Sequence, residues 1–198
     1  MSNLPGPARR RRADAERSSA AVLSAAIDLL GRRPQANMEE IAAAAGVARQ
    51  TVYAHYASRE KLLAAILEHI AAETVAVFDR LDLDELPAPA ALDRWVEASW
   101  QILARYPIVL TEAVAQPPGD EVDRHRPISR QLVELLERGR TAGQFDSTSP
   151  VTWQIAAIVA LGHAAGQEVA ADRMTPAAAG EAFRSGVLRL CLRSTPAA

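Results

Sequence analysis

The most informative part of the chain is residues 46–63, GVARQTVYAHYASREKLL. A short helix is predicted over residues 49–56, and it is crowded with long hydrogen-bonding side chains. Val52 and Tyr56 are four residues apart, so they share a face that a neighbouring helix can bury. The other side chains point outward or to the flanks: Arg49, Gln50, Thr51, Tyr53, Ala54 and His55. A surface so rich in donors and acceptors indicates a polar partner.

A second short helix is predicted directly before this one. Asn37 is a good N-cap, and Glu40 three residues later completes a capping-box pattern. Met38 and Ile41 supply the apolar face, and Gly46 supplies a left-handed stop. Two short helices joined by a glycine-containing turn form a helix-turn-helix, which places its second helix in the major groove of DNA.

The outward residue types suit this partner. Arginine and glutamine form paired hydrogen bonds with guanine and adenine edges, while threonine, tyrosine and neutral histidine donate to phosphates. The positive end of the next helix, which begins after Ser58, also suits a phosphate. For Tyr53 or His55 alone, packing against a neighbouring helix explains the residue equally well, but the whole cluster favours DNA.

Helical periodicity extends along the chain, so the predicted fold is all-α with about nine helices. We expect a disordered basic arm over residues 1–13, then a first helix from Asp14 to Leu30. The fourth helix is long and ends at LDLDELPAPA, residues 81–90. Later helices are predicted near residues 90–105, 107–115, 124–142, 150–171 and 176–193. For the last two, Ser149 and Thr175 are the expected capping hydroxyls before a proline at the first helical position.

Composition and charge restrict the function. Of the 198 residues 49% are hydrophobic, which is enough for a core. Residues 1–61 hold ten Lys/Arg against six Asp/Glu, whereas residues 62–198 hold twelve against eighteen. Only the first third is therefore suited to a polyanion. A single cysteine excludes a disulfide framework and fits a reducing cytoplasm. We expect no membrane span and no secretory signal, because the chain lacks the apolar runs that these need.

The segment EEIAAAAGVARQTVYAHYASREKLLAAIL, residues 39–67, resembles the DNA-binding segment of TetR-family (TetR/AcrR-like) transcriptional regulators. The family's Tyr-x-His-aromatic pattern at the end of the recognition helix is matched by Tyr53, His55 and Tyr56. The resemblance implies base-reading residues Arg49, Gln50, Tyr53 and Ala54, and phosphate contacts from Thr51, His55, Arg59 and Lys61. Ala48 departs from the family's common serine, and the lost N-cap should cost about 1 kcal/mol.

The resemblance also implies a DNA-binding domain over residues 14–70 and an effector-binding and dimerisation domain over residues 71–198. The expected protein is a homodimeric repressor that a small-molecule effector releases from a pseudo-palindromic operator. It would be cytoplasmic, and nucleoid-associated when bound to DNA. The arginines at residues 9–12 fit either a contact with the DNA backbone or a solvated tail.

A dimer interface is predicted on the last two helices. Its residues are Ile155, Ile158, Val159, Gly162, Gly166, Phe183, Val187 and Leu190. Apolar faces this broad suit a four-helix bundle made with a second copy, and the glycines permit close backbone approach. Ordinary packing within one chain is the alternative.

An effector pocket is predicted around the helix near residues 90–105. Its residues are Trp95, Ser99, Trp100, Leu103, Tyr106, Thr111, Glu112 and Gln131. Aromatic walls with a few polar groups are typical of ligand sites. Tryptophan in a helical domain is, however, often plain core, and these residues do not identify the ligand.

No catalytic or metal site is predicted. The histidines lack HxxxH and HExxH spacing, and no nucleophile–base pair, glycine-rich phosphate loop or carboxylate dyad stands out. We therefore expect no cofactor and no enzymatic activity. Two alternatives stay open: a ligand-binding module whose DNA-reading surface is vestigial, and a helical enzyme that uses residues 95–106.

Overall fold

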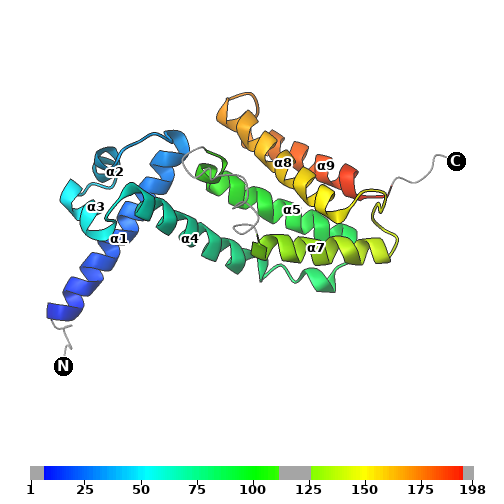
Figure 1. The fold of residues 1–198 in the computed structure, drawn as a ribbon, viewed down its shortest axis with the longest axis horizontal. Coiled ribbons are helices and arrows are strands. Elements are labelled where there is room, and N and C mark those ends of the chain that lie inside the picture. Colours follow the sequence, from blue (N-terminus) through cyan, green and yellow to red (C-terminus); the bar gives the residue numbers. More distant parts are fainter. Residues whose placement is uncertain (1–6, 112–125, 194–198) are drawn as a thin grey trace.

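The fold is that of a computed structural model of the chain, which describes residues 7–111 and 126–193. These ranges contain eight α-helices and two short 3-10 helices (Figure 1). The helices are α1 (Pro7–Arg32), α2 (Met38–Ala44), α3 (Arg49–His55), α4 (Arg59–Phe78), η1 (Leu83–Glu85), α5 (Ala88–Arg105), η2 (Pro107–Leu110), α7 (Arg126–Thr141), α8 (Val151–Ala170) and α9 (Pro176–Cys191). The predicted all-α fold is confirmed. The helix expected over residues 107–115 is observed as η2, and Glu112 lies outside the described residues.

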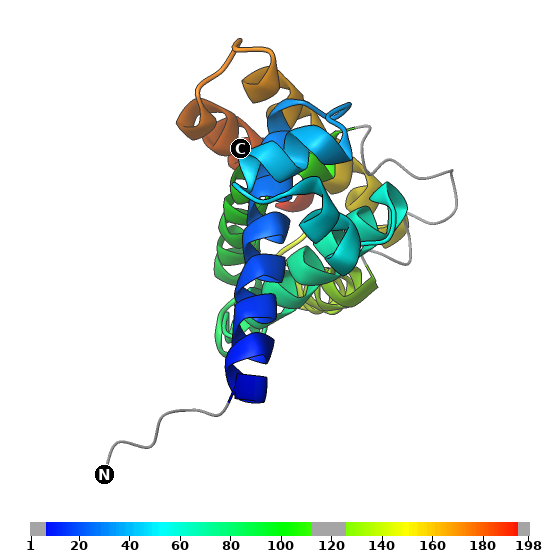
Figure 2. The same ribbon diagram turned by 90° about the vertical axis from the view of Figure 1, so that its left-hand side faces the viewer.

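A first hydrophobic cluster holds α1 to α4 together. Val22 and Leu30 of α1, Ile41 of α2, Val52 of α3 and Ile66 of α4 are all completely buried in it. We call residues 14–70, which supply most of this cluster, the head. Seen from its own end of the molecule, the head presents α2 and α3 to the viewer beside the long α1 (Figure 2).

A second cluster forms what we call the body, residues 71–193. Its buried core combines Leu92 and Val96 of α5, Leu136 of α7, Ile158 of α8 and Phe183 of α9. In these helices α8 packs along α9, while α5 contacts α7, α8 and α9. Figure 1 shows the body beside the head, with α4 running from one toward the other.

The turn chemistry of α2 is as predicted. The Asn37 side chain accepts hydrogen bonds from the backbone N–H groups of Glu39 and Glu40 at 2.9 and 3.0 Å. The Glu40 carboxylate in turn accepts from the Asn37 N–H at 2.9 Å, which completes the capping box. Gly46 follows the helix with φ of 66°, a left-handed conformation that favours glycine. The geometry of the helix-turn-helix therefore follows from its local sequence.

The start of α1 differs from the prediction. The helix begins at Pro7, not near Asp14, so residues 7–13 are helical and are not a disordered arm. The physical reason is local: proline suits the first turn of a helix, and the alanine and arginine that follow are good helix formers.

Five of the eight predicted dimer residues are buried within a single chain. Ile158, Gly162, Gly166, Phe183 and Val187 are buried, and Ile155 and Leu190 pack against the body core. Gly162 allows a close approach of Leu103, and a Cβ on Gly166 would overlap Leu110. The five buried residues already pack within one chain, because a hydrophobic period does not tell intrachain packing from an interface. Ile155, Val159 and Leu190 are half-buried and stay a prediction.

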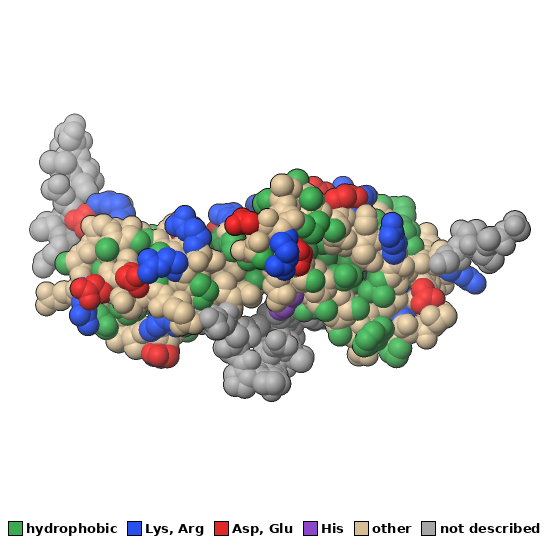
Figure 3. All heavy atoms as spheres, turned by 90° about the horizontal axis from the view of Figure 1, so that it is seen from above, with side chains coloured by type: hydrophobic (Ala, Val, Ile, Leu, Met, Phe, Trp, Pro, Cys, Tyr) green, Lys and Arg blue, Asp and Glu red, His purple; other side chains and the backbone are tan. Residues whose placement is uncertain are grey.

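The face of α8 that points to solvent carries one tryptophan and a row of alanines. Trp153 is 61% exposed, and Ala156, Ala160 and Ala164 are exposed along the same side of the helix. In the view from above, hydrophobic side chains gather over the larger lobe of the molecule (Figure 3). This stripe is an apolar surface that α8 offers to solvent beside the half-buried Ile155 and Val159.

Two negative findings concern the described residues only. None of their helices combines the length and apolar character that crossing a membrane requires. Among them, no group of three or more His, Cys, Asp or Glu side chains could hold a metal ion.

Candidate nucleic-acid interface

The short helix α3 exposes the predicted base-reading side chains. Val52 is completely buried against α1, α2 and α4, which fixes the rotation of α3. Arg49, Gln50 and Ala54 are exposed, and Tyr53 is 39% exposed although it is aromatic. Four side chains of the predicted kind therefore share one open surface at the end of the head away from the body.

The C-terminal end of α3 is tied to α1. The Tyr56 hydroxyl lies 3.0 Å from the Ser19 hydroxyl, and His55 Nε2 lies 3.2 Å from the Ser18 hydroxyl. The two contacts thus join neighbouring residues at the end of α3, His55 and its C-cap Tyr56, to neighbouring residues of α1, Ser18 and Ser19. They hold α3 at a fixed angle to α1. The contact with Ser18 engages Nε2 of His55 and does not involve Nδ1.

The predicted phosphate contacts fall into two groups. Thr51 is half-buried and Lys61 is exposed, so both side chains lie at or near the surface. Arg59, by contrast, donates to the Pro34 carbonyl at 2.6 Å and so fastens the link between α1 and α2. Ser58 caps α4 through the Lys61 N–H at 3.3 Å, as predicted. The structure thus gives Arg59 an internal partner that the sequence pattern did not reveal.

The N-terminal end of α3 has no side-chain cap. Ala48 occupies the N-cap position and makes no capping hydrogen bond, because its methyl side chain has no acceptor atom. Two other side chains surround the first residue of the helix, Arg49. Its Nη1 lies 3.8 Å from Glu39 Oε2, and its Cζ lies 5.4 Å from the centre of the Tyr53 ring.

A polar cluster joins the head to the body. The Tyr106 hydroxyl donates to Glu73 of α4, and Arg105 Nη1 lies 3.2 Å from the same carboxylate. The Tyr106 hydrogen bond lowers the pKa of Glu73. Burial, and next the bond to Glu73, raise the pKa of Tyr106 to about 12. His69 Nε2 is 3.7 Å from Glu73, so α4 and the end of α5 share one network.

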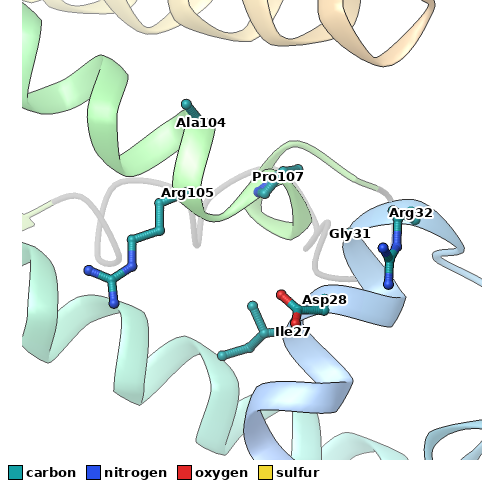
Figure 4. Close-up of a pocket in the computed structure, with 7 residues that line it drawn as sticks. All are labelled: Ile27, Asp28, Gly31, Arg32, Ala104, Arg105 and Pro107. Carbon is teal, nitrogen blue, oxygen red and sulfur yellow. The ribbon is translucent and has the colours of Figure 1, made fainter. Parts of the chain in front are cut away.

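Beside this cluster lies a hollow of about 230 Å³ between α1 and the end of α5 (Figure 4). Its lining residues are Ile27, Asp28, Gly31, Arg32, Ala104, Arg105 and Pro107. The Arg105 side chain leaves the hollow in the direction of α4, where it meets Glu73. Gly31 packs close to Pro107 and Ile108. The hollow therefore marks the seam between head and body and is not the predicted effector pocket.

The predicted effector-pocket residues do not converge on one place. Trp95 and Gln131 lie beside Phe78, with the rings of Trp95 and Phe78 5.6 Å apart and Gln131 Nε2 3.5 Å from the Phe78 carbonyl. Trp100 packs on Phe183 instead. Tyr106 belongs to the head cluster. The remaining contacts are local: Ser99 donates to the Trp95 carbonyl and Thr111 to the Ile108 carbonyl, while Leu103 faces Gly162.

Two buried polar atoms near Phe78 have no hydrogen-bond partner among the residues that the structure describes. They are Trp95 Nε1, a donor, and Gln131 Oε1, an acceptor. A buried donor or acceptor without a hydrogen bond is costly. These two atoms are therefore the described groups of the body best placed to meet a polar ligand.

The sequence did not indicate four residues that contact the predicted site residues: Ser18, Ser19, Glu39 and Glu73. Ser18 and Ser19 carry no motif signal, and their role appears only when α1 and α3 are packed. Glu39 has no motif signal of its own, and its contact with Arg49 appears only when α2 and α3 are packed. Glu73 is one acid among many on α4, and only the fold brings Tyr106 to it.

Comparisons with known proteins agree with this geometry. Residues 22–66 match the family model of bacterial regulatory proteins of the tetR family. The HTH-type transcriptional repressor LfrR of Mycolicibacterium smegmatis is 41% identical over 95 residues, an alignment that spans 48% of this chain and about half (49%) of that protein.

Solved structures extend the similarity to nearly the whole chain. The TetR-like transcriptional regulator LfrR from Mycobacterium smegmatis in complex with proflavine is 30% identical, with a TM-score of 0.67 over 90% of this chain and 98% of that one. A bacterial regulatory protein of the tetR family from Rhodococcus RHA1 is 22% identical, with a TM-score of 0.70 over 87% of this chain and 96% of that one. The latter likeness concerns the fold alone.

Proposed function

From the premise that the chain belongs to the tetR family of bacterial regulatory proteins, we propose that it is a transcriptional regulator, a repressor, that binds a specific double-stranded DNA sequence through α3. The observation that carries the proposal is the open surface of Arg49, Gln50, Tyr53 and Ala54 on a helix whose inner face is fixed by Val52. Such a protein acts in the cytoplasm, where the chromosome lies.

The side chains divide between two tasks. Arg49 and Gln50 suit guanine and adenine edges, because each forms two parallel hydrogen bonds with its base. Thr51, Lys61 and Nδ1 of His55 suit phosphates, which set the register on the duplex. Tyr53, exposed beside Arg49, can pack against a thymine methyl group. Arg59, which is bonded to Pro34, stabilises the head and adds to its positive potential.

Selection of bound duplexes from a random library, followed by titration of the best duplex at several salt concentrations, tests the proposal. We expect a pseudo-palindromic site and an affinity that falls steeply with salt, because bound phosphates release counterions. Gln50→Ala should remove about 1–3 kcal/mol of discrimination at one base pair of each half-site. Tyr53→Ala should weaken binding more broadly.

Gln101→Ala is the matched control, since Gln101 is exposed on α5 of the body, away from α3. It should leave both affinity and base preference unchanged. Binding no tighter than to random duplex, and equal for all variants, would reject DNA reading and leave a ligand-binding module as the function.

The regulator is proposed to respond to a flat aromatic effector. The relative LfrR has been solved with proflavine, and this chain places the rings of Phe78 and Trp95 next to the buried atoms Trp95 Nε1 and Gln131 Oε1. A ligand with amino groups can donate to Gln131. Proflavine also stacks between base pairs, so its binding should be measured by calorimetry on the protein alone, with Gln131→Leu as the weakened variant. Equal affinity of the variant and the parent would reject this site.

The coupling from effector to DNA is proposed to run along α4. Ile70 belongs to the head cluster and Phe78 to the body cluster, two turns apart on one uninterrupted helix. A ligand beside Phe78 would shift the end of α4, and it can weaken DNA binding only if it prefers the shifted state. In a homodimer this shift would change the spacing of about 34 Å that two recognition helices need in successive major grooves.

A further inference from the structure

Arg49 begins the recognition helix in a place that helix physics disfavours. The first turn of a helix carries a positive partial charge, so a cation there is unfavourable. Ala48 adds no capping side chain that would offset it. Residues that go against local preference are expected at functional sites. Position 49 therefore needs an explanation beyond helix stability.

Two side chains compensate for this charge and restrain it. Glu39 Oε2 of α2 lies 3.8 Å from Arg49 Nη1, and the Tyr53 ring, one turn along α3, lies 5.4 Å from Arg49 Cζ. Arg49 and Glu39 are 60% and 75% exposed. Exposed contacts of this kind are weak, so their effect is to orient the guanidinium and not to stabilise the fold.

Glu39 is itself held in place. Its backbone N–H donates to Asn37 within the capping box, and the neighbouring Glu40 bonds both the Asn37 N–H and the Arg33 guanidinium. The first turn of α2 is thus fixed by the capping box and by Arg33. A carboxylate on such a turn offers Arg49 a stable partner from outside the recognition helix.

We propose that Glu39 and Tyr53 hold Arg49 ready to read a guanine in each half-site, which makes Glu39 a specificity-determining positioning residue. The inference rests on the proposed DNA-binding function. A guanidinium has five N–H donors in one plane. Glu39 lies near Nη1, and the Tyr53 ring lies against the face of the guanidinium, so the in-plane donors on Nε and Nη2 are left for guanine O6 and N7. Glu39 also draws Arg49 away from the backbone phosphates, to which an unrestrained arginine would turn.

The test is a random-library selection with the full chain and four variants. The unchanged chain should select guanine at one position of each half-site, and Arg49→Ala should abolish that preference, a loss of about tenfold or more. Glu39→Gln should weaken the same preference roughly two- to fivefold and leave the other positions intact. Tyr53→Phe keeps the aromatic ring and should therefore keep the preference for guanine.

Glu60→Gln is the matched control. Glu60 is an exposed acid in the first turn of α4, and its substitution removes the same charge from the head as Glu39→Gln does. Both glutamine variants should tighten sequence-independent binding by a similar factor, because each removes one negative charge from the head. A guanine preference that is equal in Glu39→Gln and Glu60→Gln, or that survives Arg49→Ala, overturns the inference while the DNA-binding function stands. If the unchanged chain selects no sequence, the proposed function fails and the inference fails with it.

Discussion

At the scale of single residues, burial sets the chemistry of the titratable groups. Tyr106 is 4% exposed, yet its hydroxyl donates to Glu73 across the seam between body and head. Burial and this carboxylate raise the pKa of the phenol to about 12 from an ordinary 10. The neutral phenol is therefore the form that the folded chain favours, and it bonds α4 to the end of α5.

Tyr106 should resist ionisation in the folded chain, because burial and its bond to Glu73 raise its pKa to about 12. A folded pKa above the unfolded value means that its contribution to stability is fully present below pH 10 and is lost as the pH rises through about 12. The free energy of unfolding should fall less between about pH 10 and about pH 12 in Tyr106→Phe than in the parent. Denaturant melts and the ultraviolet absorbance of tyrosinate measure both effects. Tyr53→Phe, which removes an exposed phenol, is the control; loss of the late absorbance step in this variant would contradict the assignment.

Cys191 should be chemically silent in the folded chain. It is completely buried, and burial raises the pKa of its thiol to about 11. The thiolate is the reactive form, so an aromatic disulfide reagent should label no thiol in the native state and one thiol per chain in denaturant. Cys191→Ala supplies the blank. Rapid labelling under native conditions would show that α9 opens at its C-terminal end.

At the scale of elements, the sequence predicted what is local and failed where packing decides. The capping box of Asn37 and the stop at Gly46 were predictable because both depend on residues within one turn. Thr175 likewise caps α9 before Pro176, as predicted. Ser149 does not cap α8, which begins one residue later with Pro150 as its N-cap. Which face of α8 turns inward was not predictable, because both faces are apolar.

Two glycines of the body should respond oppositely to the same substitution. A Cβ on Gly166 of α8 would overlap the Leu110 side chain of η2, so Gly166→Ala should destabilise the chain by about 1–3 kcal/mol. A Cβ on Gly186 of α9 would meet only the flexible end of Leu161 at 3.3 Å. Because alanine is the better helix former by about 1 kcal/mol, Gly186→Ala should be neutral or slightly stabilising. Urea melts measure both, and equal destabilisation of the two variants would contradict the close packing of η2 on α8.

At the scale of the whole molecule, function depends on surfaces that one chain leaves unpaired. The head leaves α3 open, and the body leaves the stripe of Trp153, Ala156, Ala160 and Ala164 on α8. The recognition surface was predictable because its polar residues are unusual for a helix. The stripe was not, since alanine is common throughout the chain and Trp153 has no sequence signal of exposure.

The stripe is the surface on which we expect a second copy to pack. Small residues permit close helix approach, a large exposed aromatic marks an interaction site, and a two-fold dimer uses the same patch on both copies. Light scattering should therefore give twice the 21.3 kDa of one chain. Trp153→Glu should return the mass to one chain and weaken binding to a palindromic operator more than to a single half-site. Val133→Glu on α7 places the same charge at another exposed hydrophobic residue and should remain dimeric. A dimer that persists in Trp153→Glu but dissociates in Val133→Glu would move the interface from α8 to α7.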